Sequence, residues 1–369
     1  MKRKTWALVL AAAAALSMTA CGGSSQSAET TAKAEETTAA QEAQSEKAED
    51  TSKEEAKDDA GKDASGTVML YSSMQEDQLV AIKEGFEKKY PNVKMDYYFA
   101  GTGKVITKIA TEHQSGQVAA DVIWVGDPSD YISFKKEGIL AKYSSPEASA
   151  IDSKFIDPDG YYTGARMMNM GIGYNTGLVT EEEAPKSWDD LLDPKWENQI
   201  VMTDPSTAGT TKYFVGALLS DSKYGEDYFK KLKENGCELE SGTTATHNQV
   251  AAGAYKVGIM LDYVTQNLID EGSPLGFTYL PSDLVSIFSP IGLVEGCANE
   301  DNGKLLYDFI LSKEGQEILV ENNLLSVRND VEQKGESVDE IAKSAMTVDL
   351  QSLADSSDEI ISTFDSVFK

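Results

Sequence analysis

The run QIVMTDPSTAGTTKYFVGALL, residues 199–219, places an apolar strand, a loop of small residues and an apolar helix in direct succession. The loop, TDPSTAGTT at residues 203–211, consists largely of Ser, Thr and Gly. These residue types cap helices well, because their side-chain oxygens accept hydrogen bonds from the first-turn N–H groups. The same arrangement can seat an anion, since a helix start presents unpaired N–H groups at the positive end of its dipole. The loop alone leaves both interpretations open.

The same succession of strand and helix occurs elsewhere in the chain. Apolar runs predict strands at residues 68–73, 93–99, 120–126, 198–203 and 255–263. The first three lead into helices through Ser, Gly, Thr or Asp, and further helices are expected near residues 211–220, 225–235 and 246–254. Strands that alternate with helices predict an α/β fold, with a parallel sheet covered on both faces.

The strand ends indicate where a ligand would bind. Open parallel sheets bind ligands in the crevice outside the carboxyl ends of their strands. We therefore expect Ser72 and Ser73, residues 101–103, and residues 126–127 to converge on one crevice.

Two extended segments predict a division into two lobes. Residues 167–176 leave the first lobe, and residues 284–296 return to it. Two lobes joined by two crossings form a hinged pair that closes around a small molecule. We expect residues 67–170 with 280–315 in one lobe, 171–279 in the other, and C-terminal helices over 316–369.

The N-terminus, MKRKTWALVLAAAAALSMTAC, has the basic, apolar and small-residue regions of a secretory signal and is too short to span a membrane stably. The cysteine after Thr19 and Ala20 resembles the lipobox of bacterial lipoproteins, although Met18 stands where that pattern usually has Leu. The resemblance implies a signal peptide at residues 1–20, a lipid on Cys21 and an extracytoplasmic protein anchored to the cell membrane. Residues 22–66 lack aromatic residues, Leu, Ile and Val, which predicts a disordered tether.

Composition excludes several functional classes. The formal net charge of −28 argues against a nucleic-acid partner and favours solubility outside the cell. The two histidines and the cysteines show no zinc spacing, and no nucleophile lies in a motif with a base, so we predict no metal, cofactor or catalytic residue. Cys237 and Cys297 form either a disulfide or two free thiols.

Several stretches together resemble a known family. These are DPDGYYTGA (157–165), GYNTGLV (173–179), APKSWDDLLDPKWENQIVMTDPSTAGTT (184–211) and AAGAYKVGIMLDY (251–263). They are similar to the extracellular solute-binding proteins of bacterial ABC importers, in the group that binds ferric iron, phosphonates and phosphorylated solutes. The likeness runs from about residue 68 to about residue 329. It implies a type II periplasmic-binding-protein fold and a monomer that delivers a solute to permease and ATPase subunits.

The resemblance also bears on the ligand. Iron-binding relatives use two adjacent tyrosines after the strand that here reads VGIMLDY, and this chain has Tyr263 followed by Val264. They often carry His where this chain has Gln75. These departures favour a small oxyanion, a phosphonate or a phosphorylated organic compound, over iron. Ferric iron, or ligand presentation to a sensor, is the alternative.

The expected ligand-binding residues come from both lobes: Ser72, Ser73, Thr102, Gly103, Ser206, Thr207, Gly209, Thr210, Asp262 and Tyr263. Asp262 either accepts from an ammonium or a hydroxyl of the ligand, or caps the following helix. Asp127 is expected to cap its helix. His247 either touches the anion or faces solvent, and Arg166 is interpreted as a surface ion pair rather than a phosphate clamp.

Overall fold

The computed structural model describes residues 61, 63–335 and 337–369. The predicted signal peptide, the lipid on Cys21 and most of the tether lie outside these residues. No helix in the described part of the chain combines the length and the apolar character needed to cross a membrane.

The first lobe contains three parallel strands in the order β2-β1-β3. They are β1 (Gly66–Ser72), β2 (Val93–Phe99) and β3 (Val122–Trp124). Each leads into the helix predicted for it, namely α2 (Glu76–Lys89), α3 (Thr102–Gln114) and α4 (Pro128–Lys136). Leu79, Ile82 and Phe86 of α2 are fully buried, so this helix packs on the core through one apolar face.

The second lobe repeats the arrangement. Its parallel strands are β5 (Ile200–Thr203), β6 (Glu238–Glu240) and β7 (Val257–Leu261), and β8 (Leu275–Thr278) pairs antiparallel with β4. Its helices are α5 (Gly209–Ser220), α6 (Gly225–Glu234), α7 (Thr243–Ala251) and α8 (Asp262–Asp270). Two short 3₁₀ helices, η3 (Asp189–Leu192) and η4 (Pro194–Trp196), lie between β4 and β5. Two others, η1 (Pro146–Ala150) and η2 (Ser153–Phe155), precede β4 in the first lobe.

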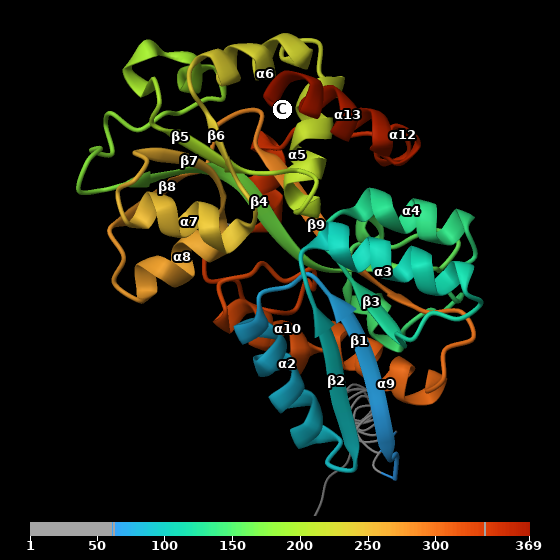
Figure 1. Cartoon of the computed structure of the whole chain (residues 1–369). Helices are drawn as coiled ribbons and strands as arrows, with labels where there is room; N and C mark the ends of the chain where they lie inside the picture. Colours follow the sequence, from blue (N-terminus) through green and yellow to red (C-terminus); the bar gives the residue numbers. More distant parts are fainter. Residues whose placement is uncertain (1–60, 62, 336) are drawn as a thin grey trace, which may run out of the picture. The chain divides into compact units, whose positions relative to one another are not determined.

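Two long strands, β4 (Thr163–Asn175) and β9 (Val285–Leu293), cross between the lobes (Figure 1). They pair with each other in antiparallel register, and they join β3 on one side to β7 on the other. The result is a nine-stranded sheet that is parallel within each lobe and antiparallel at the crossing. The predicted parallel pairing is confirmed among the strands of each lobe. The two crossing strands pair antiparallel, because a chain that crosses and returns must run in both directions there.

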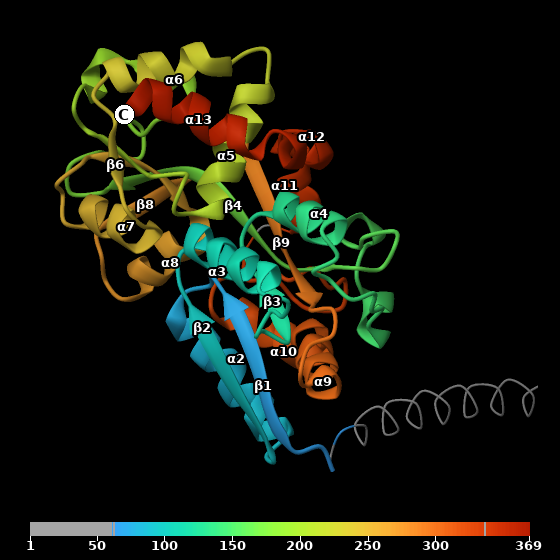
Figure 2. The same cartoon turned by 45° about the vertical axis from the view of Figure 1, so that its right-hand side comes forward.

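The C-terminal helices cover both lobes. They are α9 (Glu300–Leu311), α10 (Lys313–Glu321), α11 (Val338–Ser344), α12 (Leu350–Asp355) and α13 (Ser357–Phe368). Helix α10 packs on α2, α12 on α4, and α13 on α5 and α6 (Figure 2). The last segment of the chain thus lies beside the helices that start at the strand ends.

Two local features settle open questions from the sequence. Cys237 and Cys297 are buried free thiols, so the disulfide alternative is not realised in the structure.

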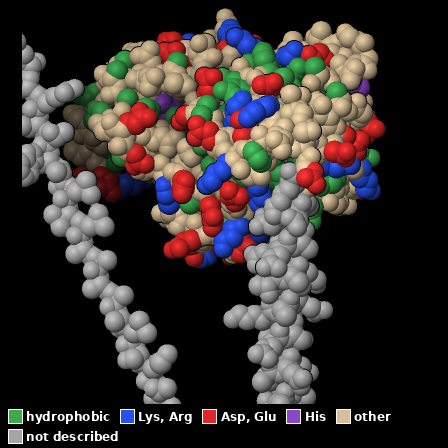
Figure 3. Space-filling view, turned by 90° about the horizontal axis from the view of Figure 1, so that it is seen from below, with side chains coloured by type: hydrophobic (Ala, Val, Ile, Leu, Met, Phe, Trp, Pro, Cys, Tyr) green, Lys and Arg blue, Asp and Glu red, His purple; other side chains and the backbone are tan. Residues whose placement is uncertain are grey.

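On the face drawn in Figure 3, acidic and basic side chains are intermingled. This face therefore presents no basic stripe of the kind that follows a nucleic-acid backbone.

Candidate functional site

A cavity of about 340 Å³ lies where the strand ends of both lobes meet. The first lobe contributes Ser73, Gln75, Phe99, Gly101, Thr102 and Gly126, and the second contributes residues 207–210, residues 241–245, Leu261 and Tyr263. Arg166 and Met168 come from the crossing strand β4. Of the residues predicted to converge on one crevice, the cavity lining includes Ser73, Gly101, Thr102 and Gly126 and omits Ser72, Gly103 and Asp127. The volume suits a small organic solute.

Five helices have their N-cap residue in the lining of this cavity, and three of them, α3, α5 and α7, have Gly or Ala there and so no side chain that could cap the helix. The N-cap residues are Gly101 for α3, Ala208 for α5 and Gly242 for α7. None of them has a side-chain oxygen that accepts from an N–H group of the first turn. The first N–H groups of a helix have no partner within the helix. The N-terminus of α4 differs, because the Asp127 carboxylate accepts from Ser129 N at 2.8 Å, as expected for a capping residue. The three uncapped starts therefore turn positive dipole ends toward the cavity.

Arg166 completes this positive environment. Its side chain is only 2% exposed and lines the cavity, and its Nε and Nη1 atoms have no hydrogen-bond partner among the described residues. The guanidinium carbon lies 5.3 Å from the ring centroid of Trp124 and 5.9 Å from that of Tyr263. Burial lowers the pKa of Arg166. A buried cation that no carboxylate among the described residues neutralises is unfavourable, so an anion in the cavity would stabilise Arg166.

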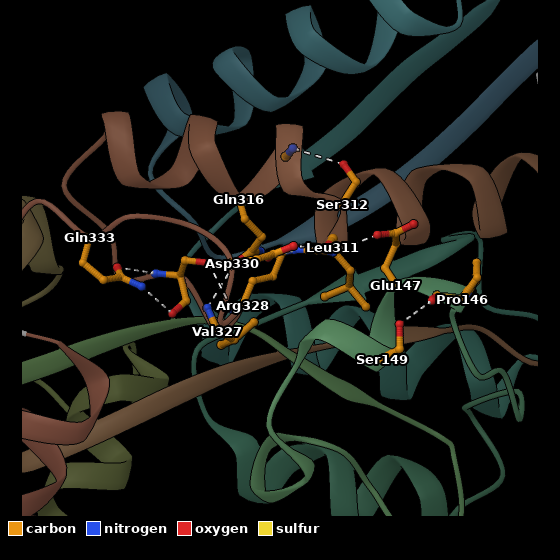
Figure 4. Close-up of polar contacts among 12 residues, drawn as sticks. Pro146, Glu147, Ser149, Leu311, Ser312, Gln316, Val327, Arg328, Asp330 and Gln333 are labelled. Atoms are coloured by element: carbon orange, nitrogen blue, oxygen red, sulfur yellow. Dashed lines mark hydrogen bonds and ion pairs between the residues drawn. The ribbon is translucent and has the colours of Figure 1, made fainter. Parts of the chain in front are cut away.

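Arg328 shows how the same fold treats a structural arginine (Figure 4). Its Nε and Nη2 atoms donate to the Asp330 carboxylate at 2.7 and 2.8 Å. Its Nη1 atom donates to Glu147 Oε2 at 2.8 Å and to the carbonyl of Leu311 at 2.9 Å. Arg328 is thus fully engaged by the protein, whereas two nitrogens of Arg166, which lines the cavity, have no hydrogen-bond partner among the described residues.

Six of the ten predicted ligand-binding residues line the cavity: Ser73, Thr102, Thr207, Gly209, Thr210 and Tyr263. Gly103 and Ser206 line a neighbouring cavity of about 650 Å³ instead. The Ser206 hydroxyl donates to Asp204 Oδ1 at 2.6 Å, and the Thr207 hydroxyl donates to the Asp204 carbonyl at 2.8 Å. These two hydroxyls therefore stabilise the loop, as do the N–H groups of residues 206–208, which also donate to Asp204. The first turn of α5 supplies the N–H groups that remain for a ligand.

Ser72 is buried and lies outside the cavity lining. Its hydroxyl donates to the Trp124 carbonyl at 2.8 Å and accepts from Met74 N at 3.1 Å. These bonds tie β1 to β3 at the point where both strands end. The structure thus gives Ser72 a supporting position behind Ser73.

Asp262 also lies outside this cavity, although the sequence placed it at a strand end that faces the ligand. Strand β7 ends at Leu261, and Asp262 is the first residue of α8. Its carboxylate accepts from Asn169 N at 3.0 Å, Asn169 Nδ2 at 2.7 Å and Tyr263 N at 2.8 Å. Burial raises the pKa of Asp262 to about 6, although these hydrogen bonds act to lower it. The carboxylate thus joins β4 to α8, and the N-cap residue is Leu261.

Two further interpretations from the sequence are wrong. Arg166 is buried at the cavity, because β4 passes between the lobes, and it is no surface ion pair. His247 is buried and neither faces solvent nor lines the cavity. Its ring nitrogens contact Thr243 O at 2.7 Å and Leu261 N at 3.1 Å, and burial lowers the pKa of His247 to about 4.

Residues 241–245 form the part of the site that the sequence reading missed. The helix expected from residue 246 begins at Thr243, so the segment Ser-Gly-Thr-Thr-Ala becomes a helix start at the cavity. The available signal was the same as in the other loops, since small hydroxyl and glycine residues follow the short strand β6. A three-residue strand with little apolar character conceals that signal.

The two lobes touch beside the cavity through one backbone hydrogen bond and one between side chains. Gly103 N donates to the Thr207 carbonyl at 3.5 Å, and the Thr244 hydroxyl donates to Gln75 Oε1 at 3.1 Å. A Cβ atom at Gly103 would lie 2.3 Å from the Ser206 carbonyl oxygen, and one at Gly101 would lie 2.7 Å from the Thr207 carbonyl oxygen. Only glycine permits this approach of two main chains.

Gly103→Ala is therefore expected to weaken ligand binding about tenfold or more, because the lobes cannot approach to the observed distance. The stability of the ligand-free protein should change little, since alanine favours the helix in which Gly103 lies. Isothermal titration calorimetry and thermal unfolding measure the two effects. Gly335→Ala is the matched control, because a Cβ atom there meets nothing within 4 Å. Equal affinity of both variants would show that the contact does not contribute to binding.

The sequence of this chain is similar to sequences of known proteins. The family model of the bacterial extracellular solute-binding proteins matches residues 119–348. An uncharacterized protein of Haemophilus influenzae is 30% identical over 267 residues, which cover 69% of this chain and 75% of that protein. A putative 2-aminoethylphosphonate-binding periplasmic protein of Salmonella typhimurium is 30% identical over 254 residues, 66% of this chain and 72% of that protein.

A solved structure extends the comparison to three dimensions. The periplasmic binding protein AfuA from Actinobacillus pleuropneumoniae, with exogenous fructose-6-phosphate bound, is 26% identical to this chain. The superposition covers 82% of this chain and 98% of that chain, with a TM-score of 0.74. Coverage of this extent includes strands and helices of both lobes.

Proposed function

Because this chain belongs to the family of bacterial extracellular solute-binding proteins and has their two-lobed type II fold, we propose that it captures a small oxyanionic solute for an ABC importer. The solute is a phosphonate or a phosphorylated organic compound. Members of this family are non-enzymatic components of transport, so the cavity binds its solute without transforming it.

The observation that carries the proposal is the environment of Arg166. A buried guanidinium with two unpartnered nitrogens lies in a cavity on which three uncapped helix starts converge. A guanidinium presents parallel donors that match the oxygens of a phosphate, and helix starts add main-chain N–H donors. Together they supply donors to several oxygens of one headgroup.

Ferric iron fits this environment less well. A ferric ion prefers several anionic oxygens, and Tyr263 is the only tyrosine among the described residues that line the cavity. Its neighbour Val264 offers no ligand atom, and burial raises the pKa of Tyr263, which disfavours the phenolate. The guanidinium of Arg166 lies 5.9 Å from the Tyr263 ring and would repel a trivalent cation.

The remaining parts of the proposal follow from the importer role. A lipid on Cys21 and the following tether would hold a monomer at the outer face of the cell membrane, where it delivers its solute to permease and ATPase subunits. Globomycin, which blocks lipoprotein signal cleavage, should cause an unprocessed precursor to accumulate if Cys21 is lipidated. Two results together would contradict the lipid anchor. Globomycin would leave processing of the precursor unchanged, and the Cys21→Ser variant would be released from the membrane no more than the parent protein.

Ligand-induced stabilisation tests the proposed function directly. A phosphonate or phosphate monoester at a hundred times its dissociation constant should stabilise the purified protein by about 2.7 kcal/mol, because it binds only the folded state. Thermal unfolding with a panel of such compounds and with ferric citrate measures this effect. A response to ferric ion alone, accompanied by a tyrosinate charge-transfer band, would contradict the oxyanion.

A further inference from the structure

The cavity contains one ionised side chain among the described residues that line it, and that side chain is the cation Arg166. The three helix starts add partial positive charge to it, roughly half a unit each at full strength. A phosphonate or phosphate headgroup carries nearly two negative charges and balances this environment. No carboxylate in the described lining remains to balance a second positive charge on the solute.

The aspartates at the strand ends are all engaged by the protein. Asp262 accepts from Asn169 and from Tyr263 N, as described above. The Asp127 carboxylate accepts from Ser129 and lies 3.0 Å from Lys212 Nζ. Each carboxylate that the sequence places near the ligand thus has protein partners and does not line the cavity.

Other carboxylates near the cavity are either engaged by the protein or exposed to solvent. Glu240, which ends β6, accepts from Gln249 Nε2 at 2.9 Å. Asp204 Oδ1 accepts from Ser206, and its Oδ2 pairs with Lys369 Nζ at 3.0 Å. Glu76 and Asp77, in the first turn of α2, are exposed to solvent. Water and salt screen such exposed charges, so they offer little to an ammonium group inside the cavity.

Apart from Arg166, the polar side chains that line the cavity are neutral, and all but Gln75 carry a hydroxyl group: Ser73, Gln75, Thr102, Thr207, Thr210, Ser241, Thr243, Thr244 and Tyr263. Phe99, which is 41% exposed, lies at the same cavity with an apolar ring face. Hydroxyl and amide groups exchange hydrogen bonds with the hydroxyls of a solute, whereas an aromatic ring packs on its carbon–hydrogen surface.

From this lining we infer that the solute is a phosphate or phosphonate with a neutral, hydroxyl-bearing body, and that the protein discriminates against an ammonium group. The inference rests on the proposed function and specifies the class of solute within it. An ammonium group would leave water for a cavity that offers it no anion, beside a guanidinium of the same charge. A hydroxyl at the same position would find donors and acceptors.

The test compares 2-hydroxyethylphosphonate with 2-aminoethylphosphonate by isothermal titration calorimetry, at a pH at which both headgroups carry two negative charges. The two compounds share their headgroup and chain length. We expect the amine to bind at least tenfold more weakly, which corresponds to about 1.4 kcal/mol. Equal or tighter binding of the amine would overturn the inference and leave the proposed function intact. If neither these compounds nor a panel of sugar and polyol phosphates bind, the proposed function falls, and the inference falls with it.

Gln75→Glu provides a matched second measurement. Glutamate has the shape of glutamine and retains the oxygen that accepts from Thr244, but it places a carboxylate in the lining. The dissociation constant of the amine divided by that of the hydroxyl compound should fall by about fivefold or more, whatever the absolute affinities. An unchanged ratio in a folded variant would contradict the inference that charge in the lining sets this preference.

Discussion

Replacing Lys212 with methionine is expected to lower the free energy of unfolding by about 3–5 kcal/mol, the effect of removing one partner from a buried ion pair. Lys212 lies in α5 of the second lobe, and its Nζ atom lies 3.0 Å from Asp127 Oδ2 and pairs with Asp130, both at the start of α4 in the first lobe. It also donates to Ser357 Oγ at 3.2 Å. Without the lysine, two buried carboxylates would face each other between the lobes.

The sign of the pH dependence follows from Asp130. Burial and the charge of Asp127 raise the pKa of Asp130 to about 7, although Lys212 acts to lower it. Removal of Lys212 raises this pKa further above the unfolded value of about 3.9. Because the folded state then binds the proton more tightly than the unfolded state, stability falls as the pH rises between the two values. The deficit of the variant should therefore be larger above about pH 7 than near pH 5.

Urea unfolding at both pH values measures this effect, provided that the denaturant dependence is the same in both proteins. Lys230→Met is the matched control, because Lys230 pairs with Glu226 on the exposed face of α6 and its loss should scarcely move the midpoint. Adding Asp130→Asn to Lys212→Met should restore part of the stability. Equal midpoints for the Lys212 and Lys230 variants would show that the buried cluster does not hold the lobes together.

Arg166→Met is expected to weaken binding of a phosphonate or phosphate monoester about a hundredfold or more, because loss of one partner of a buried charge pair costs about 2–5 kcal/mol. The ligand-free variant should be as stable as the parent or more stable. The reason is that Arg166 has two nitrogens without partners, and methionine removes their desolvation penalty while it keeps apolar contact with Trp124 and Tyr263.

Arg328→Met should behave in the opposite way. All the contacts of Arg328 shown in Figure 4 are to the protein, so its loss leaves Glu147 and Asp330 without a cation and lowers stability. The folded fraction should bind ligand with nearly unchanged affinity, since Arg328 does not line the cavity. Calorimetry and thermal unfolding of both variants separate the two roles. An Arg166→Met protein that binds within threefold of the parent would remove this residue from the site.

Much of the fold was predictable because its signals are local. The alternation of strands and helices over residues 68–136 and the Asp127 cap of α4 are read from neighbouring residues, and both predictions are confirmed. The position of Asp262 was not predictable, because it depends on the exact residue at which the strand ends. A strand that ends at Leu261 instead of Tyr263 changes the carboxylate from a group facing the ligand to a partner of Asn169.

The sequence by itself determined the α/β lobes, the two crossings and the small-residue loops that begin helices at strand ends, since each depends on the periodicity and capping preferences of neighbouring residues. Only the tertiary structure decided that Arg166 lines the cavity with two nitrogens unpartnered, that the strand-end aspartates bind protein groups, and that Lys212 joins the lobes. The charge and hydration of these buried side chains depend on groups that lie far away in the sequence. Those groups come together only when the two lobes pack.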